Sequence, residues 1–142
     1  MSGLYQNGSI LMVQEAIRRF GAEGGSIINL SSIVGSHPVA GALLYASTKG
    51  AIEALTKGLA LELAPRRIRV NAIAPGHTET EGNVAAGTFE GGAGAALAEK
   101  TPLGRLGRVS DIAPLAVFLA SEESSWITGE VIRAAGGLVV AT

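Results

Sequence analysis

Residues 26–50 read SIINLSSIVGSHPVAGALLYASTKG and join two patterns that together indicate the fold. Residues 26–31 form a short apolar run, which is typical of a strand buried inside a sheet. A loop is expected at residues 35–41, where Pro38 interrupts regular structure, and a long helix over residues 45–64. A buried strand that leads into a long helix is the unit from which α/β proteins are built.

The rest of the chain repeats this alternation of strand and helix. Helices are expected at 9–20 and 110–120, the latter capped by Ser110 with Pro114 near enough to its first turn to be tolerated, and strands at 69–74 and 130–134. We therefore predict an α/β fold with about three parallel strands, helices on both faces, and a single domain over residues 1–142. Strand 26–31 would lie at an edge of this sheet. The Gly- and Ala-rich stretch 82–98 is predicted to be a mobile surface loop or a short weak helix.

A hydroxyl, a phenol and an amine are expected to meet in this region. Ser32 follows the first strand at its carboxyl end, where ligands of open α/β sheets bind, so its hydroxyl could polarise a carbonyl group. Tyr45 and Lys49 are four residues apart and would project from one face of a helix. A nearby ammonium group stabilises a phenolate, which would make Tyr45 a usable general acid or base. Taken alone, a Tyr and a Lys at this spacing are more often an ordinary exposed pair than a catalytic one. The flanking sequence is needed to distinguish the two.

The flanking sequence supplies several motifs in the same order and register. These are INLSSIVGS (residues 28–36), YASTKGAIEALTKGLALELAP (45–65), RIRVNAIAPGHTET (67–80), PLGRLGRVSDIAPLAVFLAS (102–121) and WITGEVIRAAGG (126–137). Because of these motifs, residues Gly24 to Gly137 resemble the carboxyl-terminal half of the short-chain dehydrogenase/reductase family. Within that family they are most similar to the type of 3-oxoacyl-carrier-protein reductase and glucose dehydrogenase. The resemblance implies a truncated Rossmann-like fold that lacks the amino-terminal, dinucleotide-binding half.

The same resemblance implies a role for individual residues. Ser32 would orient the carbonyl group, Tyr45 would donate the proton, and Lys49 would activate Tyr45 and contact the ribose of the cofactor. Pro75, Gly76 and Thr80 match the turn that touches the nicotinamide end of NAD or NADP, and Asn71 matches a structural polar position beside that site. The function implied is carbonyl reduction or alcohol oxidation on a small substrate. In the family, the amino-terminal half would hold the rest of the cofactor.

Composition excludes several other classes. A net charge of −1 without a run of Lys or Arg argues against a nucleic-acid partner. The absence of cysteine excludes disulfides and thiolate metal sites, and His37 and His77 lack helper ligands, so no metal site is predicted. The apolar run at residues 10–13 is too short to span a membrane, and nothing resembles a cleaved signal. We expect a cytoplasmic protein.

Two further functions stay open. The chain could be a catalytically inactive remnant that associates with copies of itself, and the predicted helices 9–20 and 45–64 would then form a homodimer or tetramer. This pairing is also implied by the resemblance for an active enzyme. Alternatively, Ser32 beside a Tyr-Lys pair could act as the nucleophile of a weak esterase, although the sequence has no G-x-S-x-G elbow.

Overall fold

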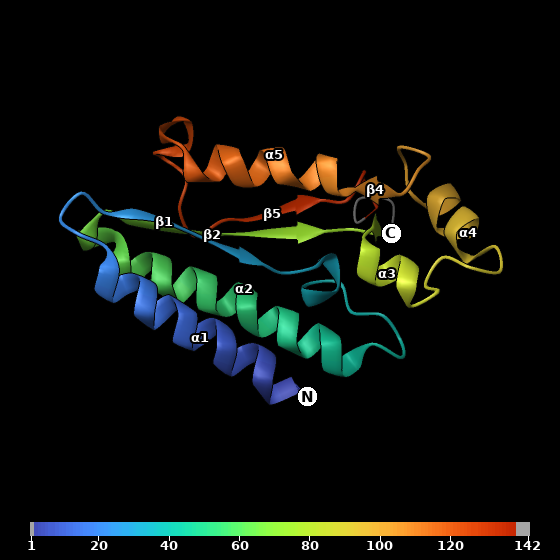
Figure 1. Cartoon of the computed structure of the whole chain (residues 1–142), viewed down its shortest axis with the longest axis horizontal. Helices are drawn as coiled ribbons and strands as arrows, with labels where there is room; N and C mark the ends of the chain where they lie inside the picture. Colours follow the sequence, from blue (N-terminus) through green and yellow to red (C-terminus); the bar gives the residue numbers. More distant parts are fainter. Residues whose placement is uncertain (1, 139–142) are drawn as a thin grey trace.

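A parallel sheet of three strands organises the computed structural model, which describes residues 2–138 and the side chains of residues 8–138. The strands are β1 (Gly25–Leu30), β2 (Ile68–Pro75) and β5 (Val131–Ala134), in the spatial order β1-β2-β5 (Figure 1). Gly25 aligns with Ile68 at the start of the β1–β2 pair, and Pro75 aligns with Ala134 at the end of the β2–β5 pair. The predicted fold class is confirmed, and β1 is an edge strand within the described residues, as expected.

Helices cover both faces of this sheet. α1 (Ser2–Arg19) and α2 (Leu43–Leu63) lie side by side on one face, and α5 (Val109–Ala120) lies on the other (Figure 1). β2 is sandwiched between them, so the side chains of Ile68, Val70 and Ile73 are at most 1% exposed. Burial on both faces explains why the strands read as continuous apolar runs rather than as an alternating pattern.

The core on the α1 and α2 side joins both helices to the first two strands. It contains Val13, Ile27, Ala60, Leu63, Ile68 and Val70, with Phe20 packed against them. The connection into β1 is tight, since Gly24 has a φ of +82° and a Cβ there would stand 2.1 Å from the Arg67 carbonyl oxygen. Only glycine fits this position.

Shorter elements connect these parts. They are η1 (Ile33–Gly35), η2 (Ala64–Arg66), β3 (Thr78–Glu79), α3 (Glu81–Ala85), α4 (Ala93–Lys100), β4 (Gly107–Arg108) and η3 (Glu122–Ser124). β3 and β4 form a separate parallel pair that the sequence did not suggest. The stretch predicted as a loop or a weak helix at 82–98 contains most of α3 and most of α4, because the Thr80 hydroxyl caps the first and alanine favours the second.

The start of α5 corrects another prediction. Ser110 is not the N-cap: the helix begins at Val109, and the N–H of Arg108 donates a hydrogen bond of 2.7 Å to the Asp111 carboxylate. Pro114 lies inside the helix, beyond its first turn. It is tolerated on an exposed face, where water can bond the carbonyl that loses its helical partner. None of the helices among residues 2–138 is long and apolar enough to cross a membrane.

Candidate functional site

The carboxyl ends of β1 and β2 and the start of α2 surround a cleft of about 290 Å³. Its lining includes all six residues selected from the sequence, which are Ser32, Tyr45, Lys49, Pro75, Gly76 and Thr80. The remaining walls are Leu30, Ser31, Thr78, Asn83, Val109 and Ile112. The structure therefore brings together residues that lie up to 48 positions apart in the chain, from Ser32 to Thr80.

Tyr45 and Lys49 are adjacent in this cleft. The Lys49 ammonium nitrogen lies 5.6 Å from the centroid of the Tyr45 ring, and it also donates a hydrogen bond of 2.9 Å to the Leu30 carbonyl at the end of β1. This bond fixes the ammonium group between the helix and the strand. Burial lowers the pKa of Lys49 from its ordinary value of 10.5. Tyr45 itself is 52% exposed, so its ring is accessible from solvent.

Ser32 is held against α2 by contacts of its neighbours. The Ser31 hydroxyl lies 3.2 Å from the Lys49 carbonyl oxygen and donates to the buried carboxylate of Glu53 at 3.1 Å. Gly35 packs on the same helix turn, where an added Cβ would lie 2.6 Å from Glu53 Oε1. These contacts place the turn that carries Ser32 beside the helix turn that carries Lys49. Sequence reasoning missed Ser31 and Glu53, which both lie inside the quoted motifs, because their contact depends on how the turn packs on the helix.

The turn after β2 is held from both ends. The Gly76 N–H donates to the Ala134 carbonyl at 3.0 Å, and Thr78 pairs with Gly107 in the β3–β4 ladder. Further on, the Thr80 hydroxyl accepts a hydrogen bond of 3.1 Å from the Asn83 N–H and so caps α3. Asn83 also lines the cleft, and its side chain donates to the Thr78 carbonyl. A Thr directly before the helix start was the available signal for this cap.

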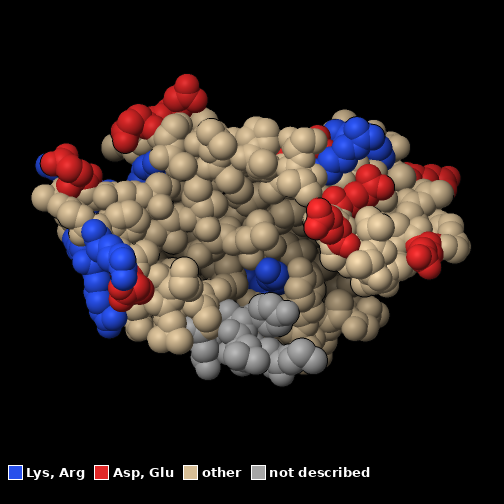
Figure 2. Space-filling model, viewed as in Figure 1, with Lys and Arg blue, Asp and Glu red and all other residues tan. Residues whose placement is uncertain are grey.

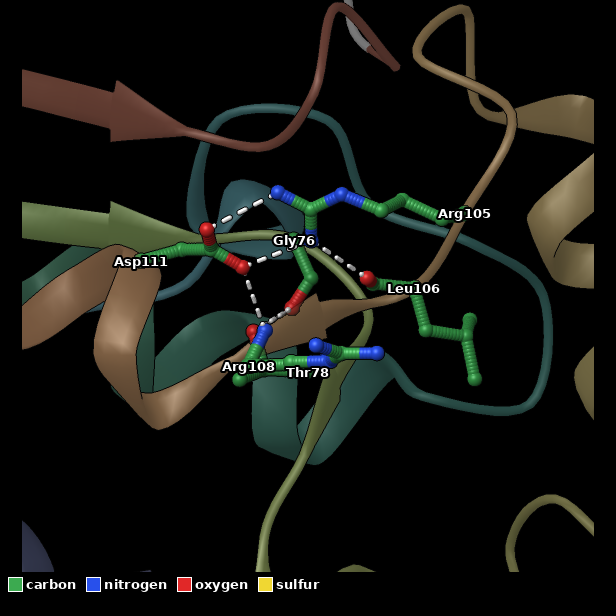
Figure 3. Close-up of polar contacts among 6 residues, drawn as sticks. All are labelled: Gly76, Thr78, Arg105, Leu106, Arg108 and Asp111. Carbon is green, nitrogen blue, oxygen red and sulfur yellow. Dashed lines mark hydrogen bonds and ion pairs between the residues drawn. The ribbon is translucent and has the colours of Figure 1, made fainter.

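A charged network braces the same turn from the other side. Two guanidinium nitrogens of Arg105 bond the two carboxylate oxygens of Asp111 at 2.7 and 2.8 Å, and the Arg108 N–H bonds one of these oxygens as well (Figure 3). These bonds lower the pKa of Asp111 to about 2, with the Arg105 hydrogen bond as the largest cause. Because Arg108 belongs to β4, the network fixes the strand against which β3 pairs.

Three other polar residues named from the sequence lie outside the cleft. Asn71 is fully buried and joins β2 to the segment before β5, through bonds to Ile127 and Glu130. His37 contacts the neighbouring Ser36 hydroxyl, and His77 faces a different cavity. No three His, Asp or Glu side chains gather as a metal site in the part of the chain that the structure describes.

Comparison with known proteins identifies the family. The sequence model of the family described as enoyl-(acyl carrier protein) reductase matches residues 4–139. A short-chain type dehydrogenase/reductase from Mycobacterium ulcerans superposes with a TM-score of 0.90 at 37% identity, over 98% of this chain and 50% of that one. The chain belongs to the short-chain dehydrogenase/reductase family. The resemblance inferred from the sequence motifs is thereby confirmed.

Other members of this family indicate the range of its chemistry. The chain is 46% identical over 116 residues to a 3-oxoacyl-[acyl-carrier-protein] reductase of Thermotoga maritima, a match that covers 82% of this chain and 46% of that protein. A gluconate 5-dehydrogenase from Burkholderia cenocepacia, solved with NADP and tartrate, has a TM-score of 0.78 at 37% identity, over 84% of this chain and 46% of that one. This short-chain dehydrogenase/reductase chain spans about half the length of the curated relatives it matches.

The donor groups of the cleft suit one end of a nicotinamide cofactor. A Lys49 ammonium, the Thr80 hydroxyl and the exposed phenol of Tyr45 are hydrogen-bonding groups that match ribose hydroxyls and a carboxamide. The Lys49 ammonium has three donors, of which the Leu30 carbonyl occupies one. Two donors therefore remain for a ligand.

Proposed function

We propose that this chain carries the reaction centre of an NAD(P)-dependent oxidoreductase that interconverts a carbonyl compound and an alcohol. The observation that supports it is the convergence of Ser32, Tyr45 and Lys49 with the Pro75–Gly76 turn and Thr80 on one cleft. Ser32, Tyr45 and Lys49 supply the hydroxyl, the phenol and the ammonium that carbonyl reduction needs. The relatives' names, which include a reductase of a 3-oxo group, point the same way.

The residues divide the proton chemistry among them. The nicotinamide, when bound, supplies or accepts the hydride. The Ser32 hydroxyl donates a hydrogen bond to the substrate oxygen and orients it, while the Tyr45 phenol gives its proton to that oxygen in reduction and takes it back in oxidation. The Lys49 ammonium lies beside the ring and stabilises the negative charge that Tyr45 acquires when it gives up the proton.

In this proposal, the cofactor is held by Lys49 and by the residues that follow β2. Lys49 would donate to ribose hydroxyls, and the Pro75–Gly76 turn with Thr80 would hold the nicotinamide end. NADP is bound to the related gluconate 5-dehydrogenase, which supports a nicotinamide dinucleotide as the cofactor class here. The substrate is a small carbonyl or alcohol compound.

Calorimetric titration of NADPH and then NADH into the purified chain tests the binding step. We expect saturable binding that Lys49→Met weakens. Reduction of a panel of ketones, followed by the loss of NADPH absorbance, then tests the chemistry. Tyr45→Phe should abolish turnover with cofactor binding retained, and Ser47→Ala, which removes an exposed hydroxyl from the same helix, should change neither. Turnover that survives Tyr45→Phe would refute the assignment.

We further propose that the chain associates with itself through α1 and α2, as a homodimer or tetramer. Both helices carry exposed apolar side chains, among them Leu11 at 63%, Met12 at 73% and Leu61 at 80% exposure. Apolar groups gathered on paired helices are typical of an interface. Light scattering at micromolar concentration should give a multiple of 14.4 kDa. A monomer mass would contradict this proposal and leave the cleft assignment unaffected.

A further inference from the structure

A second cavity, of about 420 Å³, lies between the end of β5 and the start of α5. It shares Gly76 and Ile112 with the candidate catalytic cleft but contains none of Ser32, Tyr45, Lys49 and Thr80. The Pro75–Gly76 turn therefore separates two cavities, and the role proposed above uses only one of them.

The charges around this second cavity do not cancel. Arg105 and Asp111 line it as a bidentate pair, and both Asp111 oxygens are occupied by donors from Arg105 and Arg108. Arg133, an exposed residue, lines the same cavity, and its guanidinium has no hydrogen bond or ion pair among the described residues. One cation thus faces the cavity without an acidic partner. Figure 2 shows acidic and basic side chains at both ends of the molecule, whereas the middle of that face carries few charges.

The ammonium group of Lys100 is a second positive charge, close to the His77 side chain that lines the cavity. Burial lowers the pKa of His77, another residue of the lining, and the nearby charge of Lys100 lowers it further. Lys100 is exposed and has no ion pair within the described residues. The Lys100 charge therefore adds to that of Arg133 near the cavity, and the Asp111 carboxylate is already paired with Arg105.

The backbone adds possible donors to the lining of the cavity, at Gly136 and Gly137. Gly136 and Gly137 have φ values of +60° and +87°, and a Cβ on Gly136 would stand 2.7 Å from the Thr101 methyl carbon. Their N–H groups form no hydrogen bonds within residues 2–138. Amide N–H groups beside a guanidinium are a combination that recognises oxyanions.

We propose that this second cavity binds an oxyanion, the carboxylate or phosphate group of a small ligand, with Arg133 as its principal contact. A planar guanidinium presents two parallel N–H donors that match either group. The site does not depend on the proposed reductase function, since Arg133 lies outside the catalytic cleft.

Calorimetric titration of inorganic phosphate and, separately, of acetate tests this site at constant ionic strength. We expect one-site binding of at least one anion, and the stronger of the two identifies the ligand class. Arg133→Gln should weaken that binding about tenfold or more, because it removes a charged bidentate donor. Ala135→Asp, which places a carboxylate in the cavity wall, should weaken it as well.

Lys57→Gln is the matched control, because it removes a positive charge from an exposed position on α2, away from the cavity. Circular dichroism checks that every variant is folded. Absence of saturable heat for both anions, or equal affinities in Arg133→Gln and Lys57→Gln, would overturn the proposal. Tyr45→Phe should leave anion binding unchanged, so the outcome is separable from that of the reductase assay.

Discussion

The Ser31 hydroxyl donates a hydrogen bond of 3.1 Å to Oε1 of Glu53, and this contact joins the turn after β1 to the middle of α2. Glu53 is only 8% exposed although it is a carboxylate. The bond therefore lies at the junction between the segment that carries Ser32 and the helix that carries Tyr45 and Lys49. Buried polar contacts of this kind fix relative positions because breaking them leaves a buried group unpaired.

Glu53→Ala should destabilise the chain by about 1–3 kcal/mol, since it leaves a cavity and removes the acceptor of the Ser31 hydroxyl. Urea denaturation followed by circular dichroism measures this change. Glu53→Gln keeps the size and an acceptor oxygen, so we expect a smaller loss. Glu62→Ala on the exposed side of the same helix is the control and should stay within about 0.5 kcal/mol of the parent chain. Equal effects at positions 53 and 62 would show that the buried bond contributes nothing.

Gly35→Ala should destabilise the chain by about 1–3 kcal/mol, because the new Cβ has no room against the Glu53 carboxylate and the α2 backbone. Gly58 provides a contrast within α2, since nothing lies within 4 Å of a Cβ there. Gly58→Ala should raise stability by about 0.5–1 kcal/mol through improved helix propensity. Thermal unfolding measures both changes: the melting temperature should fall in Gly35→Ala and rise in Gly58→Ala. A neutral Gly35→Ala would mean that the turn moves freely away from the helix.

Lys49→Met should separate stability from ligand binding. The substitution removes one hydrogen bond to Leu30 but also a partly buried charge, so the free energy of unfolding should change by no more than about 1 kcal/mol. Affinity for NADPH should nevertheless fall. Because the pKa of Lys49 is below its ordinary value of 10.5, the parent chain should also lose affinity as the pH rises, before it reaches that value. Affinity that stays constant up to pH 10.5 would argue against the ammonium as a contact.

Thr80→Ala should destabilise α3, the helix that follows the Pro75–Gly76 turn. It removes the N-cap of α3, a loss worth about 1 kcal/mol for a typical helix. Hydrogen exchange at Glu81–Ala85 should accelerate, while exchange in β2 stays slow. Thr80→Ser keeps the hydroxyl and should behave like the parent chain. If both variants exchange alike, the cap does not hold this helix.

Asp111→Asn should make the chain less sensitive to acid. The pKa of Asp111 falls from 3.8 to about 2 on folding, so its pairing stabilises the fold above pH 3.8 and this contribution is lost as the pH drops towards 2. Between pH 3.8 and pH 2, the melting temperature of the variant should therefore fall less than that of the parent chain. Acid titration of the melting temperature measures it, with Glu123→Gln as an exposed control. An unchanged acid profile would mean that the pairing with Arg105 adds no stability in solution.

The sequence by itself determined the features that depend on neighbours along the chain. The apolar runs at 26–31 and 69–74 became β1 and β2, and the i, i+4 spacing placed Lys49 beside Tyr45, because helix and strand geometry fix side-chain directions locally. The motifs in register also identified the family. The prediction was wrong at the start of α5, where Ser110 is not the cap and the Asp111 carboxylate instead accepts a hydrogen bond from the N–H of Arg108, the residue before the helix.

Only the tertiary structure decided which distant residues share a site. Packing of η1 on α2 brought Ser31 to Glu53, and the β3–β4 pair placed Asn83, Val109 and Ile112 around the cleft. The separation of segments along the chain carries no information on such contacts, because they depend on how helices and strands pack. For the same reason, the unpaired charge of Arg133 was visible only once its surroundings were known.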